Sequence, residues 1–245
     1  MTRIAIVGYG AMGRTIERLA PQVDVDVAAI CDIDNPFTPM TAMGVDVAID
    51  FTLPHVVPHI VRVACEAHVN LVIGTTGWYD GLDEVRAMAN EAGIGIVYGT
   101  NFSVGVQMFF RLLRRAAELA DNHPEYDIML HEWHHHRKKD APSGTALTAA
   151  QIVLDSVERK TTMYTETSHA AIDPGALHVT STRGGEIVGK HIVTIDSAVD
   201  RIELVHDAKN RDGFAMGALQ AARWLHGKKG VYDFADIFDH LGAHR

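Results

Sequence analysis

Residues 4–13, Ile4-Ala5-Ile6-Val7-Gly8-Tyr9-Gly10-Ala11-Met12-Gly13, decide the fold of this chain. The largely apolar run Arg3–Val7 predicts a buried parallel strand, and it leads straight into Gly-x-Gly-x-x-Gly. Apolar residues then recur at helical spacing, and a second apolar run, Val25–Ile30, ends at Cys31-Asp32. A strand, a glycine loop, a helix, a second strand and a terminal acid together form the fingerprint of a dinucleotide-binding fold.

The glycine loop predicts where a dinucleotide binds. Gly8 permits a tight turn, Gly10 lets the backbone approach a pyrophosphate, and Gly13 lets the helix pack closely on the strand. The start of the helix offers free N–H groups and the positive end of its dipole to phosphates. The alternative is that these glycines form an ordinary turn. We expect cofactor contacts from Gly8, Tyr9, Gly10, Ala11, Met12 and Gly13.

Asp32, at the end of the second strand, bears on the choice of cofactor. Its carboxylate can accept hydrogen bonds from the adenosine ribose hydroxyls, and it repels a 2′-phosphate. The next residue is Ile33, not an arginine that could hold that phosphate. We therefore expect NADH to serve at least as well as NADPH. The alternative is that Asp32 only caps the loop that follows it.

The alternation of strands and helices continues to residue 103. Strands are predicted at Val45–Phe51, Leu71–Ile73 and Ile94–Tyr98, and helices at Pro54–His68 and Leu82–Ala92. This pattern predicts an α/β fold with a doubly wound parallel sheet of the Rossmann type, which binds ligands at the carboxyl ends of its strands. Further cofactor contacts are expected there, although the same residue types also favour ordinary turns. These residues are Gly74, Thr75, Thr76, Gly99, Thr100, Asn101 and Phe102.

The second half of the chain predicts an inserted α+β domain. Helices are expected at Met108–Ala120 and Thr145–Val157, with an irregular loop over 159–175. Strands without intervening helices indicate an antiparallel or mixed sheet. They are expected at Tyr126–Leu130, Leu177–Thr182, Glu186–Ile195 and Arg201–His206. Two last helices are expected at Phe214–Leu225 and Asp233–Leu241.

Three segments follow from this pattern. Residues 1–104 are expected to bind the dinucleotide, residues 105–211 to bind substrate and mediate oligomerisation, and residues 212–245 to return to the first domain as helices. An open sheet face in the inserted domain needs covering, most simply by another copy of the chain. We therefore expect a homo-oligomer, assigned as a homotetramer.

Composition excludes several classes of protein. The net charge of −9 argues against a nucleic-acid partner, which would need a broad basic face. No apolar run is long enough for a transmembrane helix, and the first residues do not resemble a signal peptide. The two cysteines suit reduced core thiols and a cytoplasmic location. Cations concentrated in the second half favour a small anionic ligand.

The richest chemistry lies in residues 132–146, which read EWHHHRKKDAPSGTA. Proton donors and cations there precede a helix start, which Asp140 or Ser143 can cap. N–H groups and hydroxyls of Ser143, Gly144 and Thr145 are suited to hold a carboxylate. His131 to His135 also match the zinc motif H-E-x-x-H, which requires a helix. Since the preceding residues predict a strand, we expect no metal site.

These residues carry a resemblance to a known family. The pattern E-x-H-H-x-x-K-x-D-A-P-S-G-T-A, matched from Glu132 to Ala146, resembles that of the 4-hydroxy-tetrahydrodipicolinate (dihydrodipicolinate) reductases. Gly74–Gly77, Asn101–Ser103, Arg183–Gly185 and His206–Ala218 extend the resemblance over the whole chain. It implies an NAD(P)H-dependent oxidoreductase that reduces 4-hydroxy-tetrahydrodipicolinate, via dihydrodipicolinate, to tetrahydrodipicolinate in diaminopimelate and lysine biosynthesis. Departures from the family pattern include Asp32-Ile33, Thr100 and Trp133.

The resemblance also implies roles for individual residues. His134 would donate the proton, and Lys138 would be a second donor or stabilise charge. An imidazole titrates near neutrality, so His134 is expected to need no strong tuning. His135, together with Ser143, Gly144 and Thr145, would contact the substrate. Arg211 would bind the substrate or serve a hinge, and for Arg183 and Arg211 structural ion pairing is an equal alternative.

Two other functions fit parts of the sequence. Another NAD-dependent amino-acid dehydrogenase would share the N-terminal half but would not need the stretch from His134 to Ala146. A non-catalytic NAD-binding scaffold would not need an intact His134 and Lys138.

Overall fold

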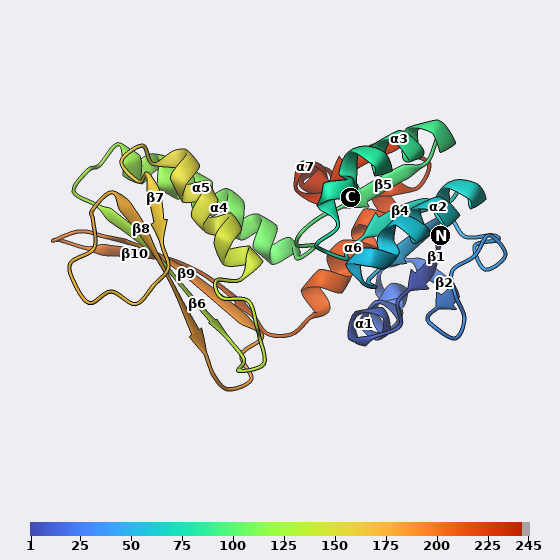
Figure 1. Ribbon diagram of the computed structural model, residues 1–245, viewed down its shortest axis with the longest axis horizontal. Helices are drawn as coiled ribbons and strands as arrows, with labels where there is room; N and C mark the ends of the chain where they lie inside the picture. Colours follow the sequence, from blue (N-terminus) through green and yellow to red (C-terminus); the bar gives the residue numbers. More distant parts are fainter. Residues whose placement is uncertain (242–245) are drawn as a thin grey trace. The chain divides into compact units, whose positions relative to one another are not determined.

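A computed structural model describes residues 1–241 and divides the chain into two compact units (Figure 1). Unit 1 comprises Met1–Val104 and the chain from Arg211 onward, and unit 2 comprises Gly105–Asn210. The chain therefore passes between the units twice, after Val104 and after Asn210.

Unit 1 is built on a six-stranded sheet with the order β11-β5-β4-β3-β1-β2. Every neighbouring pair in it is parallel, as the alternation of strands and helices predicts. Its strands are β1 Thr2–Val7, β2 Val25–Cys31, β3 Val47–Asp50, β4 Asn70–Ile73, β5 Gly95–Tyr98 and β11 Gly230–Asp233. The chain moves from β1 to β2 on one side and to β3 on the other, so the order reverses at β1, where such sheets bind ligands.

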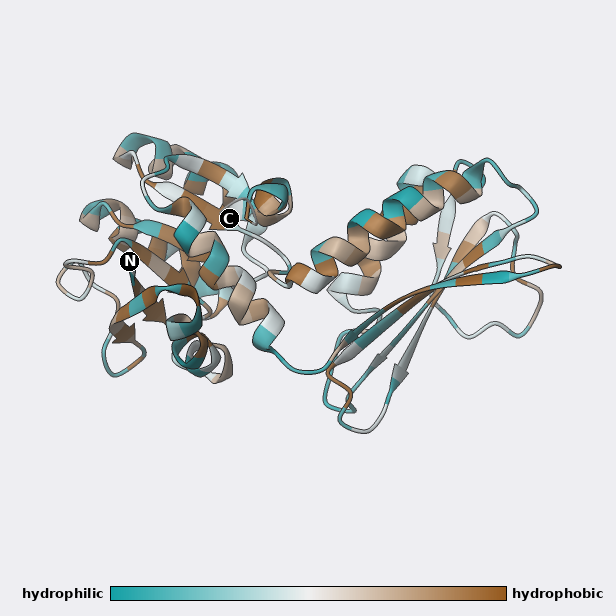
Figure 2. Ribbon diagram, turned by 180° about the vertical axis from the view of Figure 1, so that it is seen from behind, coloured by the Kyte–Doolittle hydropathy of each residue, from teal (hydrophilic) through white to brown (hydrophobic). Residues whose placement is uncertain are grey.

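Helices cover both faces of this sheet. Ile4 and Ile6 of β1 join one apolar cluster, with α1 (Ala11–Leu19) and α6 (Asp212–Leu225). Ala5 and Val7 join the other, with α2 (Val57–Ala67) and α3 (Leu82–Ala92). The strands of unit 1 are accordingly mainly apolar, and Figure 2 shows much of this sheet in brown. Shorter helices are η1 Ala20–Val23, η2 Pro54–Val56, η3 Tyr79–Gly81, α7 Phe234–Ile237 and η4 Phe238–His240.

Unit 2 packs two helices on one face of a mixed five-stranded sheet. Helices α4 (Val104–Asp121) and α5 (Gly144–Ser156) lie side by side on that face (Figure 1), and their apolar residues meet those of the strands in one cluster. The sheet order is β10-β9-β6-β8-β7, parallel at β6–β8 and β7–β8 and antiparallel elsewhere. Its strands are β6 Asp127–His134, β7 Thr162–Tyr164, β8 Ala176–Arg183, β9 Gly189–Asp196 and β10 Arg201–Ala208.

The structure corrects several predicted boundaries. β6 continues four residues past Leu130, to His134, and β9 begins at Gly189 rather than Glu186. β7 lies inside the segment predicted as an irregular loop, and β11 was not predicted. β7 reads Thr-Met-Tyr and β11 reads Gly-Val-Tyr-Asp, so neither contains a continuous apolar run, and each is held by pairing with a neighbour. The predicted helix Asp233–Leu241 is instead α7 followed by a 3-10 turn. Among the described residues, no helix is both long and apolar enough to cross a membrane.

Candidate active site

The glycine loop between β1 and α1 has the geometry that a pyrophosphate needs. Gly8 has φ +95°, and a Cβ there would lie 2.5 Å from the carbonyl oxygen of Phe51. A Cβ on Gly13 would lie 2.4 Å from the carbonyl oxygen of Gly8, whereas a Cβ on Gly10 would meet nothing within 4 Å. Gly10 is the N-cap of α1, and no side chain caps it. The loop is thus tightly packed at Gly8 and Gly13 and open at Gly10, where N–H groups can face an anion.

A cavity of about 380 Å³ lies beside this loop, at the carboxyl ends of the strands. It brings together six of the predicted cofactor residues: Gly10, Ala11, Met12, Gly74, Thr75 and Thr76. Phe51, Thr52 and Pro54 also line it, and these were missed. The signal for them was present, because they directly follow β3, just as Gly74 directly follows β4.

A buried carboxylate organises the wall of this cavity. The hydroxyl of Thr52 donates to Asp50 Oδ1 at 2.6 Å, and the N–H of Thr52 donates to Thr75 Oγ1 at 2.8 Å. Burial raises the pKa of Asp50 to about 6, and hydrogen bonds from Thr52 and Thr75 act in the opposite direction. The two threonines are therefore held in place before any ligand arrives.

The remaining predicted cofactor residues lie outside the cavity lining. Asp32 is exposed, and its Oδ1 accepts from the N–H groups of Asp34 and Asn35 at 3.0 Å each, so it does cap its loop. Phe102 is a core residue, 2% exposed, with its ring centroid 4.5 Å from that of Phe234. Tyr9 donates to Glu17. The other residues in this group are Gly8, Gly13, Gly99, Thr100 and Asn101.

In unit 2, successive side chains of β6 point to opposite faces of the sheet, which separates the residues of the H-E-x-x-H stretch. Glu132 and His134 are buried on the face covered by α4 and α5, whereas Trp133 is exposed on the other face. His131 lies on the same face as Trp133 and contacts the hydroxyls of Thr180 and Thr182. The motif lies in a strand and the turn after it, as predicted, so His131 and His135 do not share a helix face.

Glu132 is the centre of the site. It is fully buried, and its Oε1 accepts from Ser143 N at 2.9 Å, Ser181 Oγ at 2.8 Å and Arg183 Nη2 at 2.7 Å. Burial alone would favour the neutral acid, but His191 and these three donors hold the pKa of Glu132 far below its usual range. The residue is therefore a buried, charged carboxylate at neutral pH.

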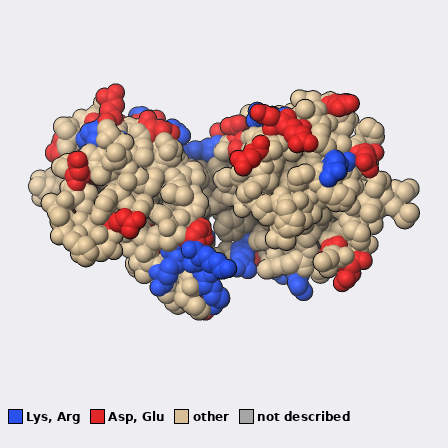
Figure 3. Space-filling model, in the orientation of Figure 1, with Lys and Arg blue, Asp and Glu red and all other residues tan. Residues whose placement is uncertain are grey.

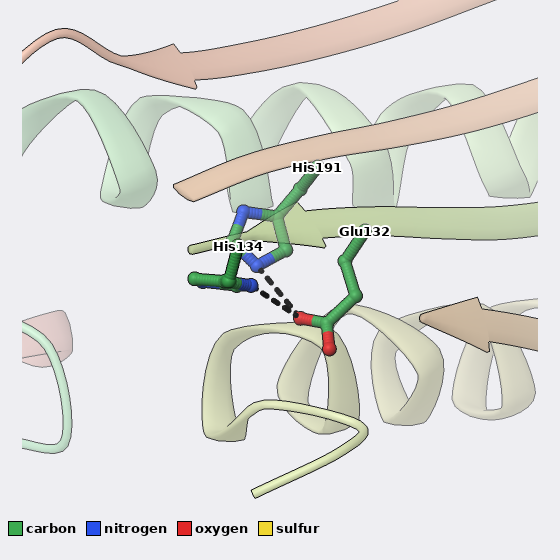
Figure 4. A group of neighbouring side chains, drawn as sticks. All are labelled: Glu132, His134 and His191. Carbon is green, nitrogen blue, oxygen red and sulfur yellow. Dashed lines mark ion pairs between the residues drawn. The ribbon is translucent and has the colours of Figure 1, made fainter. Parts of the chain in front are cut away.

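Two imidazoles face the other oxygen of this carboxylate (Figure 4). Glu132 Oε2 lies 3.4 Å from His134 Nδ1 and 3.4 Å from His191 Nε2. Burial lowers the pKa of His134 to about 4; Glu132 opposes this, while His191, Lys138 and Arg183 add to it. The expectation that His134 titrates near neutrality is therefore wrong. The cause is desolvation, which the sequence does not reveal.

Glu132, His134 and His191 also have the spacing of a metal site, with one ligand atom from each within 4.8 Å of the others. This trio differs from the H-E-x-x-H pair considered in the sequence, since His191 comes from β9. The guanidinium of Arg183, 2.7 Å from the same carboxylate, opposes a second cation there.

The turn from β6 to α5 holds the remaining predicted residues. Lys138 Nζ lies 2.8 Å from Asp140 Oδ1 and 2.9 Å from its Oδ2. His135 is half-buried, and its Nδ1 is enclosed without a partner. Figure 3 shows a group of basic side chains on one part of unit 2. Within this turn, Arg137 and Lys139 are exposed and Lys138 is half-buried. As expected, His136 and Arg137 are exposed, and Arg137 pairs with Glu186.

Ser143 caps α5, as predicted, because its Oγ accepts from Ala146 N at 3.2 Å. It is 2% exposed, and its own N–H is already bound to Glu132. The part of the predicted carboxylate grip that reaches solvent is therefore Gly144 and, in part, Thr145.

Arg183 and Arg211, each predicted either to bind substrate or to form structural ion pairs, lie in different units. Arg183 forms the ion pair with Glu132 and also donates to the carbonyl oxygen of Asp140 at 2.6 Å. These contacts correspond to structural ion pairing, the alternative to substrate binding for this residue. Arg211 is exposed and forms the N-cap position of α6, directly after the second crossing between the units.

Comparisons with known proteins identify the family of the chain. The family model described as "Dihydrodipicolinate reductase, N-terminus" matches residues 2–102, and the one described as "Dihydrodipicolinate reductase, C-terminus" matches residues 105–238. Together they span both units.

Individual relatives cover nearly the whole chain. The 4-hydroxy-tetrahydrodipicolinate reductase of Methanoregula boonei is 38% identical over 255 aligned positions, covering 97% of this chain and 98% of the relative. The enzyme of the same name from Christiangramia forsetii is 33% identical and covers 97% and 98%.

Solved structures share the fold. A dipicolinate-bound dihydrodipicolinate reductase from Paenisporosarcina sp. TG-14 superposes with a TM-score of 0.76 at 22% identity, covering 97% of this chain and 99% of the other. A meso-dapdh variant from Clostridium tetani E88 gives a lower TM-score of 0.57 at 16% identity, covering 100% and 97%. From its matched family models and its relatives, the chain belongs to the 4-hydroxy-tetrahydrodipicolinate (dihydrodipicolinate) reductase family of NAD(P)H-dependent oxidoreductases.

Proposed function

We propose that this protein reduces dihydrodipicolinate, formed from 4-hydroxy-tetrahydrodipicolinate, to tetrahydrodipicolinate, with His134 as the proton donor. The observation that carries the proposal is a buried imidazole beside a charged carboxylate, at the turn that opens α5. The cavity beside Gly10 fits a nicotinamide dinucleotide, because its glycine loop leaves open space where a Cβ would stand. That cofactor would supply the hydride, and the residues of unit 2 would supply proton and charge.

His134 would receive its proton when the substrate binds. The imidazole is neutral at pH 7 in the ligand-free protein, because burial lowers its pKa to about 4. A dicarboxylate placed beside it adds negative charge, which favours the imidazolium form. Lys138, paired with Asp140, would stabilise the charge of the substrate. The enclosed Nδ1 of His135 lacks a partner, so a substrate oxygen there would satisfy it.

One substrate carboxylate would bind at the N-terminus of α5. Gly144 is exposed and Thr145 half-buried, and the N–H groups at a helix start attract anions. Ser143 would hold this helix start in place by capping it, and its hydroxyl would donate a hydrogen bond to the substrate carboxylate. Arg211 is exposed and could bind the second carboxylate.

For the cofactor, NADH is proposed to serve at least as well as NADPH. Asp32 carries a carboxylate whose Oδ2 is not used in the loop cap, and Ile33 beside it is 95% exposed. A carboxylate accepts hydrogen bonds from a ribose diol and repels a 2′-phosphate, and no cation follows to offset it.

The open face of the unit 2 sheet supports self-association as a homotetramer. Apolar side chains on it include Met129 and Trp133 on β6 and Val205 on β10, which are 38%, 36% and 49% exposed. Residues 105–211 would thus bind substrate and mediate oligomerisation, while residues 212–241 would complete the dinucleotide-binding domain; residues 242–245 of the predicted segment lie outside the described part of the chain. Both cysteines are free thiols, which suits a cytoplasmic enzyme.

The test of function is an assay of NADH and NADPH oxidation with freshly prepared cyclic substrate. It is run beside the reverse reaction, in which NAD⁺ or NADP⁺ is reduced with amino acids. We expect turnover only with the cyclic substrate. Turnover with amino acids alone would identify an amino-acid dehydrogenase, and turnover with neither would favour a binding scaffold. Sedimentation of Val205→Asp, with Val199→Asp in the β9–β10 turn as its control, tests the proposed interface.

A further inference from the structure

We propose that Glu132 is the positioning residue of this site: one of its carboxylate oxygens orients His134 for proton donation, and the other fixes the helix start that receives the substrate. This inference rests on the role proposed for His134 and adds a residue that acts through it.

The carboxylate of Glu132 cannot turn. Three donors from two elements converge on Oε1: Ser143 N at the start of α5, and Ser181 Oγ and Arg183 Nη2 on β8. With Oε1 held by all three, Oε2 is directed at the two imidazoles (Figure 4). A group held by this many hydrogen bonds is preorganised for its partner.

The ring of His134 is held from both sides. Its Nδ1 is enclosed, with Glu132 Oε2 at 3.4 Å. On the other side, a Cβ on Gly189 would lie 3.0 Å from Nε2, so any larger residue there would press on the ring. A proton on Nδ1 therefore has one carboxylate to face, which leaves Nε2 as the nitrogen that exchanges a proton with the substrate.

The charges around His134 show why a carboxylate is needed. The charged or titratable groups that face it are Glu132 on its own strand, His191 on β9, Arg183 on β8 and Lys138 on the turn. Of these four, Glu132 is the anion. Without it, an imidazolium at His134 would be buried among cations and would not form.

His191 completes the connection between the two halves of the site. Its Nε2 lies 3.4 Å from Glu132 Oε2 and 3.2 Å from Ser143 Oγ, the atom that caps α5. Glu132 and His191 together therefore tie the proton donor on β6 to the helix start. A movement of the helix start on substrate binding would be transmitted to His134.

The tautomer of His134 tests the proposal in the unmodified protein. In ¹⁵N-histidine NMR at about pH 7, with the signals assigned by comparison with His134→Gln, we expect His134 to carry its proton on Nδ1. A proton on Nε2 instead would overturn the proposal. This measurement needs no substrate, so it stands even if the enzyme acts on a different molecule.

The variant Glu132→Gln tests the function of the carboxylate, with Glu186→Gln as a matched control from the exposed ion pair with Arg137. We expect kcat to fall by about 10²-fold or more, as when an imidazole loses the carboxylate that orients it. We also expect the basic limb of the pH–kcat profile to move to lower pH and the KM for NADH to stay within about twofold. A fall in kcat with an unmoved basic limb would show a merely structural role and overturn the proposal.

Two further measurements keep the result interpretable. If the unpaired Arg183 unfolds Glu132→Gln, the double variant Glu132→Gln/Arg183→Met removes the stranded cation as well, and the same shift of the basic limb is expected. If activity of the parent protein is lost to a chelator and restored by Zn²⁺, Glu132 serves as a metal ligand and the proposal is wrong.

Discussion

The backbone N–H of Ser143 donates to Oε1 of Glu132 at 2.9 Å, across eleven residues of chain. This bond joins the end of β6 to the start of α5 and closes the turn that carries His135, Lys138 and Asp140. His134, the proposed proton donor, and the proposed carboxylate grip are therefore both in contact with one buried carboxylate. Their separation is set by a buried carboxylate and not by the flexibility of the turn.

Replacing Ser143 should loosen this connection. Ser143→Ala removes the hydroxyl that caps α5, which costs about 1 kcal/mol in the free energy of unfolding. We expect the KM for the cyclic substrate to rise while the KM for the cofactor, which is proposed to bind in unit 1, stays unchanged. Thr148→Ala, in the next turn of the same helix, is the control, because its exposed hydroxyl donates only to the carbonyl of Gly144. Equal changes in both KM values would contradict a local role.

Replacing His134 should stop proton transfer. His134→Gln is expected to lower kcat by about 10² to 10⁴, the usual contribution of a positioned acid. His136→Gln, on the same turn but exposed, should retain nearly full activity. Stopped-flow measurement of cofactor oxidation gives both values. Unchanged turnover in His134→Gln would remove this residue from the mechanism.

The buried state of His134 should also appear in the pH dependence of stability. Its pKa is lowered to about 4 in the folded protein from 6.5, so the unfolded chain binds more protons between these values. This contribution to stability is present above pH 6.5 and is lost as the pH falls towards 4. The loss in the free energy of unfolding between pH 6.5 and about pH 5 amounts to about 1.5 kcal/mol. Urea unfolding of unit 2 should be less steeply pH-dependent in His134→Gln, and an unaltered slope would contradict the burial.

The sequence predicted unit 1 better than the active site for a physical reason. The glycine loop and its flanking strands are neighbours in the chain, so their local sequence pattern is enough to predict the fold. The partners of Glu132 are not: Ser181 and Arg183 lie 49 and 51 residues further along. Only the pairing of β6 with β8 brings them together. The same tertiary packing buries His134. Neither its lowered pKa nor the proposed role of Glu132 can therefore be predicted from one segment of the sequence.

The choice of cofactor should respond to the charge of Asp32. Asp32→Asn keeps an oxygen that can cap the loop at Asp34 and Asn35 but removes the negative charge. We expect the kcat/KM for NADPH to rise relative to that for NADH, because the 2′-phosphate is no longer repelled. Asp34→Asn, exposed two residues further on, is the matched control. A ratio that is unchanged in Asp32→Asn would mean that Asp32 serves only the loop.

Alanine substitutions at two glycines of the same loop should affect different properties, stability at Gly13 and cofactor binding at Gly10. In Gly13→Ala the new Cβ would lie 2.4 Å from a backbone oxygen, so we expect a loss of about 1–3 kcal/mol in the free energy of unfolding. In Gly10→Ala the Cβ meets nothing within 4 Å, and φ is −82°, so stability should change by less than about 0.5 kcal/mol. That methyl group would instead occupy the space proposed for the pyrophosphate, raising the Kd for NADH by about tenfold or more. Thermal unfolding and fluorescence titration with NADH separate the two effects. If Gly10→Ala bound NADH normally, the cofactor would lie elsewhere than in the cavity beside this loop.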